Sequence, residues 1–288
     1  ISAFDLPTFT EESVYPDEVD QKNFLNGLTS VDWVEHKKRA WGEDSARYKA
    51  KVLGEFPDEA DNTFFAQGVL DKAYDATIED DGSVRPVLGL DVARFGSDEN
   101  VLYENIGGRV RRIDAWSKLD LIETARRVHT HAQRIMATVI NVDVNGVGGG
   151  VVDALVRLDE FADAVYSVGA INNSSASPDS TRWLNARAWH YDTFREMMSD
   201  GKIDLDYEDN ELREELISQT YKFSPRGSIQ MTSKDEMKKS GMSSPDNLDA
   251  AILCTIDMTR FEGLQPGDVI TGVEEMFDEH PFYSDTYW

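Results

Sequence analysis

The sequence predicts an α/β protein with a mixed central β-sheet flanked by helices and preceded by a helical N-terminal extension. Two observations support this fold class. From about residue 82 onward, short apolar runs of strand length alternate with segments whose apolar residues recur at helical spacing. The first three predicted strands follow one another closely, whereas each of the next two is preceded by a helix. Such an order favours parallel pairing in a mixed sheet covered on both faces.

The extension and the first strands come first along the chain. Residues 30–56 place apolar side chains at roughly helical intervals, and "DDGS" at 80–83 separates them from the first strand. Gly107 and Gly108 are a strong hairpin signal between two strands. The elements expected in this half are strands at 87–92, 100–106 and 109–116 and a helix at 119–136.

The second half alternates strands and helices. An apolar strand is followed by the glycine-rich "NGVGGG" and a helix, and a later helix stops at Gly201, as helices commonly stop at a glycine. The elements expected here are strands at 137–144, 164–170 and 202–206, a strand pair at 221–225 and 227–231, and helices at 151–158, 185–201, 210–219, 233–239 and 244–258.

This order of elements is that of the ribonuclease H-like fold. The actin-like ATPase fold opens in the same way, so the order alone does not choose between them. An actin-like ATPase or sugar kinase needs Gly, Thr and Ser phosphate loops after the first strand, where "DVARFGSDEN" supplies one glycine and a further acid. No GxxxxGK[ST] motif occurs, which excludes a Walker-type ATP site.

Composition excludes several other classes. The chain has 29 basic and 54 acidic residues among 288, a net charge of −25, and its ends (1–20 and 261–288) carry acids without any Lys or Arg. Affinity for DNA should therefore be low and strongly salt-dependent. The single cysteine, Cys254, excludes a disulfide framework and a cysteine-based zinc site. No apolar run approaches the ~20 residues needed to cross a bilayer, and no secretory signal opens the sequence, so we expect a cytoplasmic protein.

Three aspartates stand at the ends of predicted elements. Asp91 and Asp143 end two apolar strands, and Asp246 opens the last helix, where we expect Ser244 as N-cap and Pro245 as first helical residue. Each aspartate alone is accounted for by an ordinary structural role, as a cap or strand end. Together, at one edge of a sheet, such carboxylates require a cation, and oxygen ligands suit Mg²⁺ or Mn²⁺. Two such ions can cleave a phosphodiester.

Two further features neighbour these acids. The glycine-rich loop, with Gly148 at its centre, either lets backbone N–H groups approach a phosphate or only allows a tight strand-to-helix turn. Modest basic clusters are candidates for contacts to DNA phosphates because they neighbour the proposed site, although for each taken singly a solvated surface is the better explanation. These basic residues are Arg94, Arg226, Lys234, Lys238 and Lys239.

The sequence resembles the C-terminal nuclease domain of the large terminase subunit of tailed bacteriophages over about residues 30–258. The matching stretches are "YKAKVLGEFP", "GLDVARFGSD", "VDVNGVGGGVVDAL" and "YKFSPRGSIQMTSKDEMKKSGMSSPDNLDAAILC". The resemblance implies a ribonuclease H-like fold and a metal-dependent endonuclease that cuts concatemeric double-stranded phage DNA during packaging. It places the three family acids on Asp91, Asp143 and Asp246, and possible auxiliary acids on Asp98 and Asp249.

The resemblance also implies a context. Its ATPase half is absent, so we expect a fragment whose partners are double-stranded DNA and, in the full-length protein, the ATPase domain, the small terminase subunit and the portal. The isolated domain is expected to be monomeric, in the cytoplasm of the infected bacterial host and without membrane contact. Many relatives carry His or Asp where this chain has Pro245, which leaves the second metal site less complete, for Asp98 or Asp249 to fill.

The expected division of the chain is an extension at 1–81, a nuclease domain at 82–260 and an acidic tail at 261–288. The tail is either disordered or, as its aromatic residues favour, a partner-docking peptide. Three alternative functions remain: a junction resolvase or transposase-like nuclease of the same fold, an actin-like ATPase, and a non-catalytic module that docks on DNA or the portal. The "VLGEFP" segment argues against the first, and the acid in "DVARFGSDEN" against the second.

Overall fold

The computed structural model describes residues 2–6, 29, 31–41, 48, 52–54, 62–80, 82–93, 99–162, 166–256 and 269–271. The chain divides into two compact units, residues 1–63 and 64–288. The second unit thus begins earlier than the expected boundary at residue 82. The reason is that Phe64 and Phe65 are buried, with their rings against those of Tyr191 and Phe194.

In the first unit, helix α2 (Val31–Trp41) and the short 3-10 helix η1 (Ala3–Asp5) confirm part of the predicted helical extension. Ala3, Val34, Tyr48 and Val52 form a small buried cluster there. The remainder of the predicted helix at 30–56 lies largely outside the described residues.

The second unit is built on a seven-stranded mixed sheet with the order β6-β3-β2-β1-β4-β5-β9. β1, β2 and β3 form an antiparallel meander, and β4 and β5 follow in parallel beside β1, which confirms the predicted order. The strands are β1 (Val87–Asp91), β2 (Asn100–Ile106), β3 (Arg109–Trp116), β4 (Val139–Asp143), β5 (Ser167–Ile171), β6 (Asp204–Leu205) and β9 (Val269–Thr271).

β9 lies within the segment expected to be an acidic tail. It pairs in parallel with β5 and extends the sheet at that edge. The other residues of 261–288, including the aromatic residues expected to dock a partner, lie outside the described residues. A separate hairpin, β7 (Tyr221–Phe223) and β8 (Ile229–Met231), matches the predicted strand pair.

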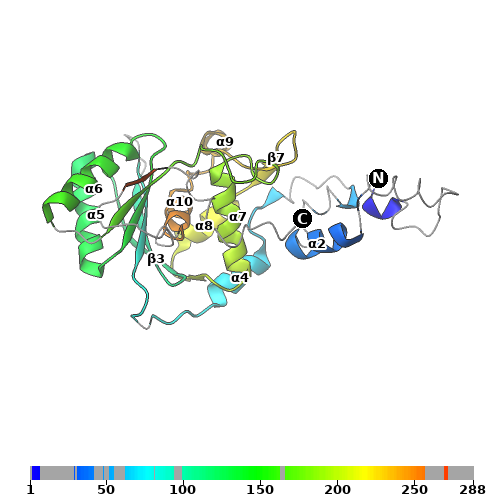
Figure 1. Ribbon diagram of the computed structural model, residues 1–288, viewed down its shortest axis with the longest axis horizontal. Coiled ribbons are helices and arrows are strands. Elements are labelled where there is room, and N and C mark those ends of the chain that lie inside the picture. The colour runs from blue at the N-terminus through cyan, green and yellow to red at the C-terminus, as the bar shows by residue number, and fades with distance from the viewer. Residues whose placement is uncertain are drawn as a thin grey trace. The chain divides into compact units, whose positions relative to one another are not determined.

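Helices cover both faces of this sheet (Figure 1). The described helices of this unit are α4 (Gln67–Asp75), α5 (Leu121–Ile135), α6 (Gly148–Ala162), α7 (Ala186–Ser199), α8 (Asn210–Ser218), α9 (Lys234–Lys239) and α10 (Asp246–Leu253). α4 was not predicted as a separate helix. No helix in the described parts of the chain is both long and apolar enough to cross a membrane.

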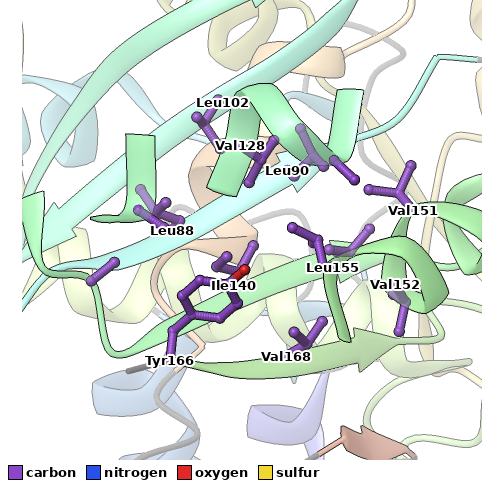
Figure 2. Packing of buried hydrophobic residues seen from close by; sticks show 14 of the residues in the cluster. Leu88, Leu90, Leu102, Val128, Ile140, Val151, Val152, Leu155, Tyr166 and Val168 are labelled. Atoms are coloured by element: carbon purple, nitrogen blue, oxygen red, sulfur yellow. The ribbon is translucent and has the colours of Figure 1, made fainter. Parts of the chain in front are cut away.

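The alternation of side chains along the central strands gives the sheet two different faces. Leu88 and Leu90 of β1 and Ile140 and Val142 of β4 join the large apolar cluster formed with α5 and α6 (Figure 2). The residues between them on each strand point to the opposite face, which α10 covers. Asp91 and Asp143 therefore lie on the α10 face.

Gly89 lets α10 lie directly against β1. A Cβ atom at Gly89 would stand 2.2 Å from the carbonyl oxygen of Ala250 and 2.3 Å from the amide nitrogen of Cys254. The absence of a side chain at this position therefore sets the distance between helix and sheet.

Asn141 fixes the other end of α10 to the sheet. Its Nδ2 donates hydrogen bonds to the carbonyl oxygens of Leu253 (2.9 Å), the last residue of the helix, and of Ile256 (2.7 Å), three residues beyond it. Gly169 on neighbouring β5 provides room for this amide, since a Cβ there would lie 2.2 Å from Asn141 Oδ1. These uncharged residues thus fix both the distance of α10 from the sheet and the position of its C-terminal end.

Candidate metal centre

Two of the predicted acids come from adjacent strands. β1 and β4 pair in parallel with Leu90 opposite Val142, so that Asp91 and Asp143 follow side by side at the same end of the sheet. Both side chains are buried, at 4% and 9% exposure. Asp143 accepts hydrogen bonds from the Asn145 amide (2.8 Å) at Oδ1 and from Asn173 Nδ2 (3.2 Å) at Oδ2.

The other two acids come from the first turn of α10. Asp246 begins the helix and Asp249 lies one turn further, as expected. The expected cap is wrong by one position: Pro245 occupies the N-cap position without a capping side chain, and Ser244 Oγ instead donates to Asp246. The cap is supplied from another helix, because Glu215 of α8 accepts hydrogen bonds from the Leu248 amide (2.7 Å) and Asn247 Nδ2 (2.7 Å).

Lys234, the first residue of α9, forms ion pairs with acids of both β1 and α10. Its Nζ lies 3.1 Å from Asp91 Oδ2, 3.1 Å from Asp246 Oδ1 and 2.9 Å from Asp249 Oδ2. The contact of Lys234 with DNA phosphates stays a prediction; in this structure its charge is engaged by three carboxylates. α9 is set in place by Ser233, which caps it in a reciprocal pair with Glu236.

Asp249 is surrounded by donors. The Tyr191 hydroxyl donates to its Oδ1 at 2.6 Å, and Arg187 Nε lies 3.6 Å from the same oxygen. Arg187 is itself fixed, since it donates to the Thr232 carbonyl oxygen and to the Tyr191 hydroxyl, each at 2.9 Å. Asp249 is therefore anchored at the base of the cluster by two cations and a phenol.

The pKa values of the buried acids are shifted in different directions. Burial raises the pKa of Asp91 well above its usual range; Lys234 opposes this rise, whereas Asp249, Asp246 and Asp143 add to it. Burial also raises the pKa of Asp143, against the effect of the Asn145 amide. For Asp249, burial is outweighed by Lys234 and Arg187, so its pKa lies below the usual range. Four carboxylates thus share two cations, and Asp91 is the least compensated.

This donor set fits a hard divalent cation. The four side chains present only carboxylate oxygens, the ligands that Mg²⁺ and Mn²⁺ prefer, and a further positive charge would relieve the repulsion around Asp91. As they lie, no three acids, histidines or cysteines within the described ranges are grouped closely enough to hold an ion. Lys234 stands among three of the four acids, so binding would require its ammonium group to shift.

The structure describes four of the other predicted site residues. Gly148 opens α6, and a Cβ there would stand 1.9 Å from the Asp143 carbonyl oxygen, which supports the tight-turn interpretation of the glycine-rich loop. Arg226, in the turn of the β7–β8 hairpin, and Lys238 and Lys239, at the end of α9, are exposed. Arg94 and Asp98 lie outside the described residues.

Several residues of the cluster were not predicted. Arg187 and Tyr191 are four apart on α7 and Glu215 is on α8, so their contacts arise from tertiary packing. A local signal existed for the α7 pair, since an Arg and a Tyr at this spacing share one helix face. Nothing local distinguishes Glu215 from its neighbour Glu214.

Comparison with known proteins identifies the fold. No protein-family model matches the sequence, and no curated protein does. Among solved structures, the nuclease domain of the large terminase subunit gp2 of bacterial virus Sf6, with manganese and beta-thujaplicinol, is similar with a TM-score of 0.58 and 21% identity, over 66% of this chain and 96% of that one. A second structure of that domain gives a TM-score of 0.57 with the same identity and coverage.

A third similar structure comes from another virus. The large terminase nuclease from thermophilic phage G20c, with bound magnesium, has a TM-score of 0.50 and 16% identity, over 69% of this chain and 97% of that one. At these identities the likeness concerns the fold. The chain has the fold of these large-terminase nuclease domains, which supports the predicted ribonuclease H-like class; the order of the elements alone had left the actin-like fold open.

Proposed function

We propose that this chain is the nuclease part of a phage large terminase, a divalent-metal-dependent endonuclease that cuts concatemeric double-stranded DNA during genome packaging. The observation that carries the proposal is a cluster of four carboxylates from β1, β4 and α10, three of them buried and Asp246 half-buried, which two cations among the described residues compensate. The similar nuclease domains with manganese and magnesium support it.

In this proposal Asp91, Asp143 and Asp246 hold two Mg²⁺ or Mn²⁺ ions, with Asp249 and Asp98 as auxiliary acids. Bound ions supply Lewis-acid activation of the phosphodiester and of the attacking water. Asp91, whose charge is repelled by Asp249, Asp246 and Asp143, would gain most from a bound cation. Asp249, already held by Tyr191 and Arg187, orients Lys234 toward the other acids.

The exposed basic residues bind the substrate. Arg226, Lys238 and Lys239 contact backbone phosphates and position the DNA without reading its sequence. Arg94 is proposed to act in the same way. Gly148 contributes by allowing the close turn beside Asp143. In the full-length protein the partners are the ATPase domain, the small terminase subunit and the portal, in the cytoplasm of the infected host.

A plasmid assay tests this function. Supercoiled plasmid incubated with the chain and Mn²⁺ or Mg²⁺ should be nicked and then degraded, and EDTA should prevent both. Asp91→Asn should reduce cutting by more than about 100-fold, because it removes a carboxylate that would hold the metal directly, and even changes to the partners behind a ligand cost about 10- to 100-fold. The matched control is Asp114→Asn. It changes an acid of β3 that pairs with Arg127 of α5, and this variant should cut normally.

Four outcomes would contradict the proposal. Equal cutting by Asp91→Asn and the parent would show that the site is wrong. Activity confined to branched DNA would favour a junction resolvase, and ATP hydrolysis by the purified chain would favour an actin-like ATPase. A chain that binds DNA but neither binds metal nor cuts would be a docking module.

A further inference from the structure

A pair of buried polar residues stands behind Asp143. Asn173 lies two residues beyond β5, and its Nδ2 donates to Asp143 Oδ2 at 3.2 Å. On its other side, Asn173 Oδ1 lies 3.0 Å from Nδ1 of His190 on α7. Asn173 and His190 are 7% and 5% exposed, so both are nearly closed off from water. Asp143, Asn173 and His190 thus form a chain from the candidate metal centre into the protein.

The hydrogen-bond chemistry gives this chain a direction. A carboxylate only accepts hydrogen bonds, so the Asn173 amide must turn its NH₂ toward Asp143 and its oxygen toward His190. His190 must then carry its proton on Nδ1. The second nitrogen, Nε2, is left as a bare acceptor, and it finds no hydrogen-bond partner among the described residues. Burial lowers the pKa of His190 to about 3, which keeps the ring neutral and is consistent with one proton, on Nδ1.

The backbone holds this chain in place. The Asn173 carbonyl oxygen accepts the Arg187 amide at 3.0 Å, and the Ser175 carbonyl oxygen accepts the Ala186 amide at 3.0 Å. The loop after β5 is therefore bound to the first turn of α7, the helix that carries His190. Because the strand ladder continues with a hydrogen bond from the Val144 amide to the Ile171 carbonyl oxygen, Asp143 and Asn173 are also tied together through the sheet.

We propose that Asn173, oriented by His190, is the positioning residue of Asp143 and fixes this carboxylate for a divalent cation. The proposal rests on the proposed function. Asn173 holds Oδ2 while the Asn145 amide holds Oδ1, so the carboxylate cannot rotate, yet each oxygen keeps a lone pair for a metal. Partners of this kind behind a ligand typically change metal affinity by about 10- to 100-fold.

Mn²⁺ binding without DNA measures the effect directly. In titrations of the full chain, we expect Asn173→Ala to weaken Mn²⁺ affinity by about 10- to 100-fold. His190→Leu should weaken it in the same direction, whereas His190→Asn should restore it, because its amide NH₂ replaces the Nδ1 donor. His129→Leu is the matched control, since it removes a histidine bonded to Tyr166 away from the site, and it should bind Mn²⁺ like the parent.

A spectroscopic measurement covers the case in which a variant fails to fold. With ¹⁵N-labelled histidine, the unmodified protein should show His190 as the neutral Nδ1–H tautomer, identified by the signals missing from His190→Asn. An Nε2–H tautomer would overturn the proposal. So would unchanged Mn²⁺ affinity in folded Asn173→Ala, while the proposed function would stand. Failure of the unmodified chain to bind Mn²⁺ would overturn both.

Discussion

On one face of the central sheet, Leu88 and Leu90 pack beneath α5 and α6 in a continuous apolar cluster. On the other face, the intervening positions of the same strands hold Gly89, Asp91 and Asn141, each of which meets a specific atom of α10 or α9. The apolar face is stabilised by burial, which depends on volume and tolerates exchange of similar side chains. The α10 face is stabilised by contacts between particular atoms, so each of its residues must keep those atoms at a fixed distance.

The largest expected effect comes from closing the gap between β1 and α10. Gly89→Ala should lower the free energy of unfolding by at least about 4 kcal/mol, because its Cβ would meet backbone atoms that cannot move aside independently. Denaturant unfolding measures this. Gly68→Ala in α4 is the control: its Cβ meets nothing within 4 Å, so it should change stability by less than about 1 kcal/mol. Equal effects would mean that α10 is not held by close packing.

The next comparison uses neighbouring residues that face opposite ways. Leu90→Ala should cost about 2–5 kcal/mol of stability, since it empties part of the buried cluster. Asp91→Asn should leave stability unchanged or raise it, because it removes a buried charge repelled by three other acids. Thermal unfolding of the two variants, beside the plasmid assay, checks both. A larger loss for Asp91→Asn than for Leu90→Ala would show that the acids stabilise the fold.

A smaller effect is expected at the start of α10. Glu215→Ala should lower stability by about 1–3 kcal/mol, because it leaves the Leu248 amide and the Asn247 side chain without their acceptor. Glu214→Ala, one residue away and exposed, should change stability by less than about 0.5 kcal/mol. Denaturant unfolding separates the two. Similar losses in both variants would contradict a capping role for Glu215.

The last prediction concerns the pH dependence that His190 gives to the free energy of unfolding. Its pKa is about 3 in the folded protein against 6.5 for an ordinary histidine, because burial disfavours the charged ring. Between these values the unfolded chain binds more protons, so this contribution to stability falls as the pH is lowered, by up to about 1.4 kcal/mol per pH unit. We expect His190→Asn to lack this component.

Unfolding measured across pH for both proteins tests this. The stability of the parent relative to His190→Asn should decline as the pH falls below about 6.5, and should be constant above about pH 7. A constant difference throughout would mean that His190 is not buried in its neutral form.

Local patterns in the sequence predicted most of the second unit. Strands such as β1 and β4 were found because a short apolar run that ends at Asp is typical of a buried strand, and the acids were found because they end those runs. α4 was missed because its short apolar pattern is preceded by irregular chain. β9 was missed because three residues gain strand pairing only from β5.

Within the site, the acids were easier to predict than their counterions. Asp91 and Asp246 stand at element ends, which the sequence displays. Lys234 looked like a surface residue on a short basic helix, and only the folded chain brings it to carboxylates from β1 and α10. Arg187, Tyr191 and Glu215 became recognisable in the same way, through contacts between helices distant in sequence.

The contact between Gly169 and Asn141 has a consequence for how this chain can vary. Any side chain at Gly169 would displace the Asn141 amide that binds the end of α10. The two positions are therefore epistatic: a side chain at Gly169 is tolerated only together with a change at Asn141 that makes room for it. Asn141 binds the end of α10, and α10 carries Asp246. This uncharged pair therefore limits which substitutions keep Asp246 in its place.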